Sequence, residues 1–307
     1  MIELFARSPG MREAVGLAER VSSTDANVLI TGESGAGKDV LASYIHWKSP
    51  RAAQPLVKID CATLPGELLE AELFGYERGA FTGASEAKPG RFEAAQKGTV
   101  VLDEIAHLST DAQAKLLRVI ETREFERLGG RRTIKLDARL IVLTNVDLAG
   151  AVKAGRFRED LLYRLDVIHI RVPPLRERKD DLSKLIQYFV QHYAAKHGRK
   201  LERVSAPALA MLQSYDFPGN ARELANIIER AVIVANGKRL EEEDLPPSLS
   251  AAVTAQRQKA KPPSLAELEA AYIAETLAVT KGNKTECARI LGISRKNLYE
   301  KIARYKL

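Results

Sequence analysis

The chain has 307 residues, of which 45% are hydrophobic and 28% charged, and a formal net charge of +7. This length allows one large domain with a smaller one, and the composition is typical of a soluble globular protein. No apolar run approaches the roughly 20 residues that cross a membrane, and no basic-then-apolar signal segment begins the chain. We therefore expect a cytoplasmic protein with no membrane contact.

The first half of the chain alternates short apolar runs with helical patterns. The runs, rich in β-branched residues, lie at 28–30, 56–59, 99–102, 140–143 and 167–170. Continuous apolar strands separated by helices are typical of a parallel sheet covered on both faces. Pro173 and Pro174 end this pattern, and from 179 to 236 the apolar spacing is helical. We predict an α/β subdomain over residues 1–173 and a helical subdomain over 174–245.

A change of composition separates the last part of the chain. Residues 246–263 begin and end with Pro-Pro and are rich in Ala, Gln, Lys and Ser, which is typical of a linker. Residues 264–307 then contain three helical patterns, with start signals at Ser264, Asn283 and Ser294. Gly292 interrupts the pattern before the last helix. The first helix carries an apolar face formed by Leu265, Leu268, Tyr272 and Leu277.

The last helix is basic on its outer side. Leu298, Ile302 and Tyr305 have helical spacing and are expected to face inward. The side chains expected outside are Arg295, Lys296, Asn297, Tyr299 and Lys301. Residues 281–307 hold eight basic side chains against two acidic ones, so most of the net charge lies here. A helix, a glycine-containing turn and a basic helix form a helix-turn-helix, which predicts binding of double-stranded DNA. A three-helix packing module is the alternative.

A glycine-rich segment connects the first strand to a helix. Glycines let backbone N–H groups wrap phosphates, the helix N-terminus adds positive potential, and Lys38 reaches the terminal phosphates. We predict a nucleotide-binding loop made of Gly32, Glu33, Ser34, Gly35, Ala36, Gly37, Lys38 and Asp39. Position 39 is Asp where the usual loop has Ser or Thr for magnesium. Coordination of Mg²⁺ is therefore expected to rely on water and on Asp103.

Polar pairs end two later strands. Asp103 can hold Mg²⁺ through water, and Glu104 can polarise the attacking water. Thr144 and Asn145 end the next strand, where a polar side chain can sense the γ-phosphate; for Asn145 a structural turn is the alternative.

Two further features point away from this site. Arg158 and Arg164 near the rim of the domain either form surface salt bridges or act as arginine fingers on the ATP of a neighbouring subunit. An uncharged loop with one aromatic and one hydroxyl side chain indicates contact with another protein; it consists of Gly79, Ala80, Phe81, Thr82, Gly83 and Ala84.

Together these residues resemble the AAA+ activators of sigma-54-dependent transcription, and the likeness runs across nearly the whole chain. The motifs that carry it are Gly32–Asp39, Glu72–Gly75, Gly79–Ala84, Leu102–Ile105, Gly155–Leu161, Pro174–Arg178, Pro218–Leu224 and Gly282–Ser294. Generic AAA+ proteins share the nucleotide motifs, whereas the Gly79–Ala84 loop is close to diagnostic for this family. The last motif resembles the Fis-type helix-turn-helix of these activators.

The resemblance implies an AAA+ P-loop domain with a parallel sheet between helices, a helical lid and an all-α helix-turn-helix domain. It implies ATP and Mg²⁺ as cofactors, a hexameric ring with ATP between subunits, and a dimer through the C-terminal domain. Thr144 and Asn145 would be sensor I, and Arg222 sensor II. Arg158 and Arg164 would act on the neighbour's ATP.

The resemblance also implies the partners. Phe81 and Thr82 would engage sigma-54, and residues 126–130 would form a second pore loop. Hydrolysis would move the loops and remodel the closed complex of sigma-54 RNA polymerase into the open complex, while the helix-turn-helix holds upstream DNA. Two rivals stay open: an AAA+ unfoldase, and a DNA-binding regulator with a vestigial ATPase.

Two residues depart from the family pattern. Asp39 replaces the commoner Glu, and Asp60 stands where the family commonly has Asn. A carboxylate at Asp60 would repel Glu104 unless it is protonated or bridged, so a switch formed by these two residues is expected to work differently here.

The motifs begin within the first ten residues, so the printed sequence lacks the sensory domain that often precedes them. The chain is then either naturally short and controlled in trans, or trimmed.

Overall fold

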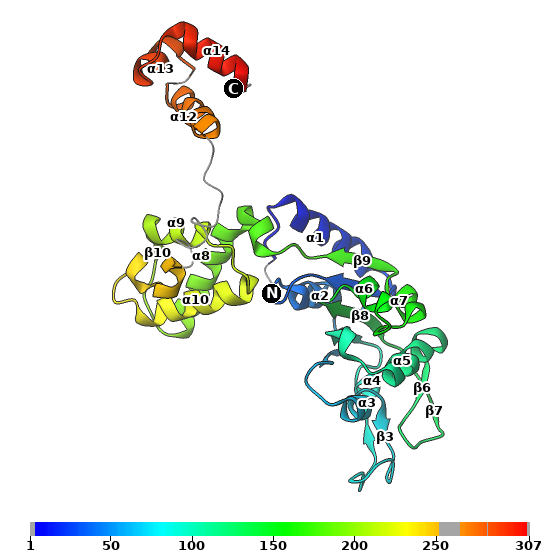
Figure 1. The fold of residues 1–307 in the computed structure, drawn as a ribbon. Coiled ribbons are helices and arrows are strands. Elements are labelled where there is room, and N and C mark those ends of the chain that lie inside the picture. The colour runs from blue at the N-terminus through cyan, green and yellow to red at the C-terminus, as the bar shows by residue number, and fades with distance from the viewer. Residues whose placement is uncertain (1–3, 252–264, 281, 306–307) are drawn as a thin grey trace. The chain divides into compact units, whose positions relative to one another are not determined.

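The structure, a computed structural model, describes residues 4–251, 265–280 and 282–305. The chain divides into two compact units, Met1–Leu249 and Ser250–Leu307 (Figure 1). The expected start signal at Ser264 and most of the expected linker lie outside the described residues.

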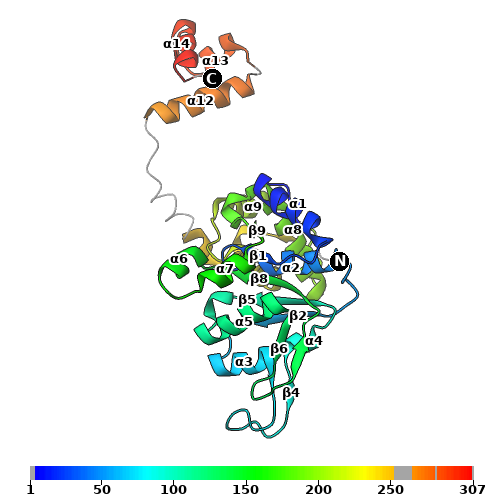
Figure 2. The same ribbon diagram turned by 90° about the vertical axis from the view of Figure 1, so that its right-hand side faces the viewer.

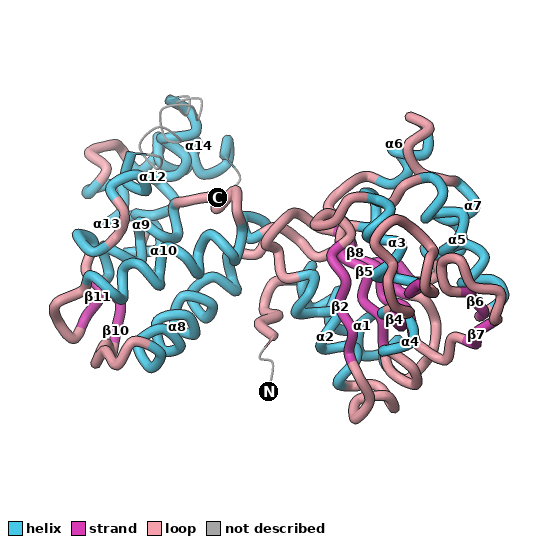
Figure 3. Tube along the Cα trace, turned by 90° about the horizontal axis from the view of Figure 1, so that it is seen from below, coloured by secondary structure: helices cyan, strands magenta, loops and turns pink. Residues whose placement is uncertain are grey.

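A parallel sheet forms the centre of the α/β part of the first unit (Figure 3). The order of its strands is β2-β5-β8-β1-β9. Its strands are β1 Val28–Thr31, β2 Leu56–Asp60, β5 Thr99–Asp103, β8 Arg139–Thr144 and β9 Ile168–Arg171. All five strands match the predicted apolar runs, which confirms the predicted fold class. Because the strands are parallel, their carboxyl ends meet at one edge, and Asp60 pairs in register with Asp103 there.

Helices cover both faces of the sheet. In β1, Val28 and Ile30 pack with α1 and α2, whereas Leu29 packs with α3, α5 and α7 on the other face. This alternation fully buries the strand and explains its continuous apolar sequence. The helices of this part are α1 Pro9–Ser22, α2 Lys38–Trp47, α3 Gly66–Phe74, α4 Arg91–Ala94, the 3₁₀ turn Ile105–His107, α5 Thr110–Thr122, α6 Leu148–Lys153 and α7 Glu159–Leu165 (Figure 2).

Two hairpins protrude from the α/β part at the end away from the lid (Figure 1). Their strands are β3 Gly75–Tyr76, β4 Lys88–Pro89, β6 Glu124–Glu126 and β7 Thr133–Lys135. The Gly79–Ala84 loop joins β3 to β4, and residues 127–132 join β6 to β7. An isolated bridge between Tyr76 and Leu128 connects the two hairpins.

The lid is helical, as predicted. It contains a 3₁₀ turn Leu175–Glu177, α8 Lys179–Lys196, β10 Arg203–Val204, α9 Ala206–Ser214, α10 Asn220–Val234, β11 Arg239–Leu240 and a 3₁₀ turn Glu242–Asp244. Leu249 is 3% exposed and belongs to the lid core together with Leu245. The lid therefore extends at least to Leu249, past the expected linker start at 246, because its core buries this side chain.

The second unit is made of α12 Leu265–Val279, α13 Lys284–Ile290 and α14 Arg295–Tyr305. Its small core contains Ile273, Cys287 and Leu298, against which Ile302 and Tyr305 pack. The predicted inward face of the last helix is confirmed. The apolar face predicted on the first helix is different: Leu265, Leu268 and Tyr272 are 87%, 52% and 57% exposed. Ile273 takes the buried position instead, so most of the apolar face of α12 meets solvent.

Candidate active site and its interaction loops

The phosphate-binding loop lies between β1 and α2 and closes around its own lysine. Lys38 is 6% exposed, and its Nζ donates to the carbonyls of Gly32 at 2.8 Å and Glu33 at 3.2 Å. Burial lowers the pKa of Lys38, while the carboxylates of Glu104 and Asp103 act in the opposite direction. Gly37 adopts a φ of +101° and a Cβ there would meet nothing within 4 Å, so the loop leaves open space beside this backbone. An amine inside an open loop of this kind fits a phosphate group.

Two lid residues bind the phosphate-binding loop at the Glu33 carboxylate. Arg176 donates to both carboxylate oxygens of Glu33, at 2.6 and 2.8 Å, and Asn220 Nδ2 donates to the same carboxylate at 3.0 Å. These bonds, led by that of Arg176, lower the pKa of Glu33 to about 2. Asn220 begins α10 with a φ of +55°, a conformation that Asn tolerates better than most residues. Its Oδ1 also accepts from Leu175 N at 2.7 Å, which connects the start of α10 to the first 3₁₀ turn of the lid.

Other lid groups contact the same loop. Arg222 donates to Ser34 Oγ at 3.0 Å, and Ala221 N donates to the Gly35 carbonyl at 3.0 Å. Arg178 is 5% exposed and donates to the Ala36 carbonyl. Burial lowers the pKa of this arginine. The predicted sensor II residue, Arg222, therefore lies at the phosphate-binding loop.

Asp103 and Glu104 stand at the end of β5, next to the loop. Glu104 adopts a left-handed conformation, with φ 54° and ψ 49°, which turns the chain out of the strand. Such a conformation in a residue other than glycine is costly and recurs at functional sites. Its Oε2 accepts from Asn145 N at 3.4 Å. Asp103 forms an ion pair with Lys58, whose Nζ lies 3.1 Å from Asp103 Oδ2.

Asp60 uses its carboxylate locally. Its Oδ1 accepts from Ala62 N at 2.9 Å, and its carbonyl accepts from Thr63 Oγ1 at 3.0 Å. Within the described ranges its side chain forms no hydrogen bond or ion pair with Glu104. The expected direct repulsion between these two carboxylates therefore remains a prediction.

The two sensor I candidates differ in accessibility. Thr144 is fully buried, its Oγ1 accepts from Val146 N at 3.1 Å, and its carbonyl accepts from Gly32 N at 3.3 Å. Asn145 is exposed at the strand end. Thr144 thus supports the phosphate-binding loop, and Asn145 has the side chain that is free to meet a ligand.

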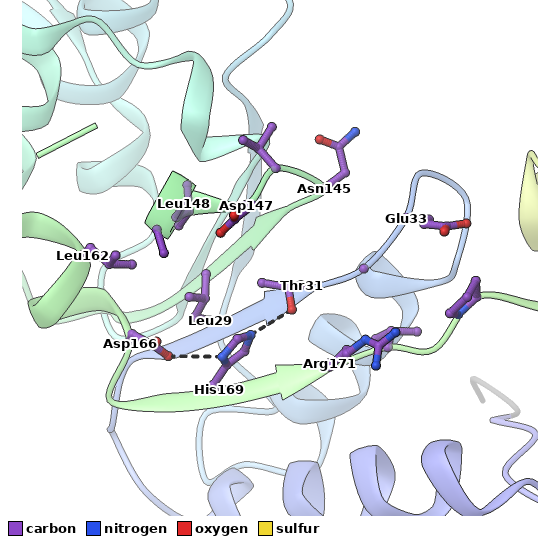
Figure 4. A pocket seen from close by; sticks show the side chains of 15 residues that line it. Leu29, Thr31, Glu33, Asn145, Asp147, Leu148, Leu162, Asp166, His169 and Arg171 are labelled. Atoms are coloured by element: carbon purple, nitrogen blue, oxygen red, sulfur yellow. Dashed lines mark hydrogen bonds and ion pairs between the residues drawn. The ribbon is translucent and has the colours of Figure 1, made fainter. Parts of the chain in front are cut away.

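A cavity of about 340 Å³ adjoins this region (Figure 4). Glu33, Asn145 and Asp147 line it, as does His169, whose Nε2 lies 2.8 Å from Thr31 Oγ1. Its lining includes neither Lys38 nor the acidic pair of β5. The cavity is therefore a neighbour of the reacting centre and does not contain it.

The two arginine-finger candidates lie on or next to α7 and form ion pairs there. Arg158 pairs with Asp160 at 2.7 Å, and Arg164 pairs with Glu121 at 3.1 Å. In the part of the chain that the structure describes, neither guanidinium bonds to the phosphate-binding loop. Both pairs are largely exposed, so they hold the arginines only weakly.

The Gly79–Ala84 loop is closed by its own backbone. Gly79 N donates to the Ala84 carbonyl at 2.8 Å, and Ala84 N donates to the Phe81 carbonyl at 3.0 Å. Phe81 is 37% exposed, and its ring lies edge-on to Tyr76 with centroids 5.0 Å apart. Thr82 is exposed, whereas Ala84 is 6% exposed and faces the stem. Five of the six residues are therefore at least partly accessible to a partner, and only Ala84 is buried.

The second loop is fastened to the stem of the first. Leu128 N donates to the Gly75 carbonyl and Leu128 O accepts from Glu77 N, both at 2.9 Å. Arg127 pairs with Glu93 at 2.8 Å and with Glu77 at 3.2 Å. The Glu93 hydrogen bond raises the pKa of this arginine. The two loops therefore form one connected projection.

The second unit displays the predicted DNA-facing side chains on α14. Asn283 caps α13 by accepting from Thr285 N and Glu286 N, and Gly292 supplies the turn with a φ of +66°. Of the side chains predicted to face outward on α14, those of Arg295, Lys296, Asn297 and Tyr299 are exposed. The prediction that the Lys301 side chain faces outward is not met.

Lys301 is 21% exposed and pairs with Glu269 of α12 at 2.6 Å. It therefore joins two helices of the unit. Tyr299 is also engaged, because Lys284 Nζ lies 4.8 Å from its ring centroid.

The sequence analysis did not predict three contacts of the site. Glu33 belongs to the predicted phosphate-binding loop, but the sequence gives no signal for its contacts with Arg176 and Asn220. Lys58 reads as an ordinary polar residue of an edge strand, and only strand register places it beside Asp103. Arg178 was part of a quoted motif, which was the one available signal for its contact with the loop.

Known families cover the chain in three consecutive segments. Residues 4–171 match the family described as Sigma-54 interaction domain, and residues 176–262 match an AAA+ ATPase lid domain. Residues 264–305 match the bacterial regulatory proteins of the Fis family.

Curated relatives are similar over nearly the whole chain. Regulatory protein AtoC of Escherichia coli (strain K12) is 44% identical over 310 residues, covering 98% of this chain and 67% of that protein. Transcriptional regulatory protein FlbD of Caulobacter vibrioides is 43% identical, covering 98% of this chain and 70% of that protein. Nitrogen fixation protein VnfA of Azotobacter vinelandii is 45% identical, covering 99% of this chain and 59% of that protein. The chain thus spans between 59% and 70% of the length of these relatives.

Solved structures agree with the fold. NtrX from Brucella abortus in complex with ADP has a TM-score of 0.74 and 32% identity, covering 100% of this chain and 70% of that chain. The complex of NtrX with ATP has a TM-score of 0.73 and 34% identity, covering 99% of this chain and 69% of that chain. No helix in the described ranges is long and apolar enough to cross a membrane.

Proposed function

Because the chain belongs to the sigma-54-dependent transcriptional activators, with an AAA+ ATPase domain and a DNA-binding helix-turn-helix domain, we propose that it uses ATP hydrolysis to open promoters. In this proposal it remodels the closed complex of sigma-54 RNA polymerase into the open complex. The observation that carries the proposal is the exposed tip at Phe81 and Thr82, on a projection tied to an ATPase domain.

The loop and strand-end residues supply the ATPase chemistry. Lys38 and the loop N–H groups bind the phosphates, and Arg222 reaches them from the lid. Asp103 would hold Mg²⁺ beside the nucleotide, because carboxylate oxygens are ligands that this ion prefers, and the ion would supply positive charge to the phosphates. Glu104 accepts the proton of the attacking water, and Asn145 senses the γ-phosphate. Thr144 acts through the backbone of the loop, since its hydroxyl is buried.

A ring completes this site. In the described part of the chain, the side chains of Arg158 and Arg164 bond to Asp160 and Glu121 and not to the phosphate-binding loop, so we assign them to the ATP of the neighbouring subunit in a hexamer. Their exposed ion pairs with Asp160 and Glu121 are weak enough to be exchanged for a phosphate contact. Each active site then uses residues from two subunits.

The C-terminal unit binds upstream DNA through α14. Arg295, Lys296 and Asn297 are exposed on it and contact phosphates or base edges, with Tyr299 beside them. We place a dimer contact on the exposed apolar face of α12 that contains Leu268. Sedimentation of Leu268→Glu checks this, because a variant that dimerises like the wild type would rule the face out.

The test measures ATP-dependent promoter opening by purified sigma-54 RNA polymerase. The wild type should open the promoter with ATP. Glu104→Gln should lose turnover by roughly 100-fold or more, as expected for loss of a general base, while it still binds nucleotide. Vigorous ATPase activity of the wild type without promoter opening would contradict the proposal and favour a different client, as for an unfoldase.

A further inference from the structure

Lys58 brings a positive charge to the magnesium end of the site. It lies on β2, two residues before Asp60 and therefore on the same face of the strand. This is the face toward α2, because Lys58 Nζ lies 3.9 Å from Asp39 Oδ2 and 3.1 Å from Asp103 Oδ2. One ammonium group thus stands between the carboxylates of a helix and of a neighbouring strand.

The two lysines of the site are engaged in different ways. Lys38 is buried, and its amine donates to two loop carbonyls. The side chain of Lys58 is 45% exposed, and its partners are carboxylates. The side chain of Asp103 is only 21% exposed, so its charge is poorly compensated by solvent. In the described part of the chain, its ion-pair partner is Lys58.

Asp60 adds a reason for a cation at this place. It lies opposite Asp103 in the register of β2 and β5, so two carboxylates leave adjoining strand ends. Like charges that face one another across strands destabilise a sheet. A positive charge beside them offsets this repulsion whether an ammonium group or a metal ion supplies it. Lys58 and Mg²⁺ therefore serve the same carboxylate.

We propose that Lys58 is a resident counter-cation of the magnesium site: it holds Asp103 in the nucleotide-free chain and releases it when Mg²⁺ enters with the nucleotide. The lysine thereby competes with the metal and weakens the linkage between metal and nucleotide binding. The inference rests on the proposed nucleotide site. Lys58 is a positioning residue here, because it acts through the Asp103 carboxylate.

The experiment measures binding, not turnover. Calorimetry of the full chain gives the Kd of ADP with saturating Mg²⁺ and with EDTA. The Kd in EDTA divided by the Kd in Mg²⁺ measures the linkage between metal and nucleotide binding. Lys58→Met, which keeps most of the aliphatic stem, should increase this ratio by about threefold to fivefold, the size expected for one half-exposed charge pair. Lys58→Arg, which keeps the cation, should stay close to the wild-type ratio. In an Asp103→Asn background, Lys58→Met should add nothing.

Lys115→Met is the matched control, because Lys115 forms a similarly exposed ion pair with Glu70 between α5 and α3. It should leave both affinities at wild-type values. A lower or unchanged ratio in Lys58→Met would overturn the proposal. Equal losses of affinity with and without Mg²⁺ would do so too, and would indicate that Lys58 contacts the nucleotide itself. Failure of the wild type to bind ADP under either condition would overturn the nucleotide site and this inference with it.

Discussion

Two glycine-containing loops of the α/β part are held in opposite ways. The phosphate-binding loop is fixed by its surroundings: a Cβ at Gly35 would lie 2.4 Å from the Gly219 carbonyl and 2.9 Å from Arg222 Cβ. The Gly79–Ala84 loop is held by its own turns, and a Cβ at Gly79 or Gly83 would meet nothing within 4 Å. Glycine serves close approach in the first loop and backbone freedom in the second.

The first loop is therefore suited to nucleotide binding, and the second to transmitting a movement to a partner. A loop clamped by Arg176 and Asn220 presents a nearly formed site, so little ordering remains when a nucleotide binds. A loop with an exposed tip and few outside contacts can change position when its stem moves. The stem is connected to the second loop through Arg127, which gives such a movement a physical route.

The sharpest way to break the comparison is to add one methyl group to each loop. Gly35 and Gly79 both have positive φ, +73° and +83°, so the backbone strain of an alanine is similar, on the order of 1 kcal/mol. Gly35→Ala must also displace the lid and should raise the Kd of ADP by roughly tenfold or more. Gly79→Ala should leave it unchanged. Similar Kd values for the two variants would show that the lid does not clamp the loop.

A smaller effect should follow from the Glu33 contact. Its folded pKa, about 2, lies below the ordinary 4.5, so the bond with Arg176 contributes stability above pH 4.5 and loses it as the pH falls toward 2. Glu33→Gln should therefore lower the Tm at pH 7 by about 2 °C, a modest value because the pair is partly exposed. The gap should shrink between pH 4.5 and 3. A gap that is constant across this range would contradict the assignment.

Much of the fold could be predicted because its signals are local. The five strands are continuous apolar runs, and Asn283 and Gly292 mark helix boundaries through their own chemistry. Helical spacing also shows which residues of α12 share a face. It cannot show whether that face is buried, and in the described part of the chain Leu268 and Tyr272 are exposed.

The site was predicted less completely, since its contacts join distant segments. Glu33 lies 143 residues from Arg176, and no local pattern indicates their pairing. Lys58 and Asp103 meet only because β2 and β5 are neighbours in a definite register. Lys301 was expected outside from its helical position, and its pairing with Glu269 depends on how α12 crosses α14. Register and helix crossing are tertiary properties, so sequence spacing alone does not determine them.

We propose that ATP hydrolysis and contact with sigma-54 depend on two separate sites of one domain, the phosphate-binding loop and the tip of the Gly79–Ala84 loop. The most direct measurement compares Thr82→Ala with the wild type for both ATPase rate and promoter opening by sigma-54 RNA polymerase. Thr82 is exposed at the loop tip, so the variant should fold normally and keep its ATPase rate within about twofold of the wild type. The account predicts that promoter opening is lost. Wild-type opening by Thr82→Ala would contradict it.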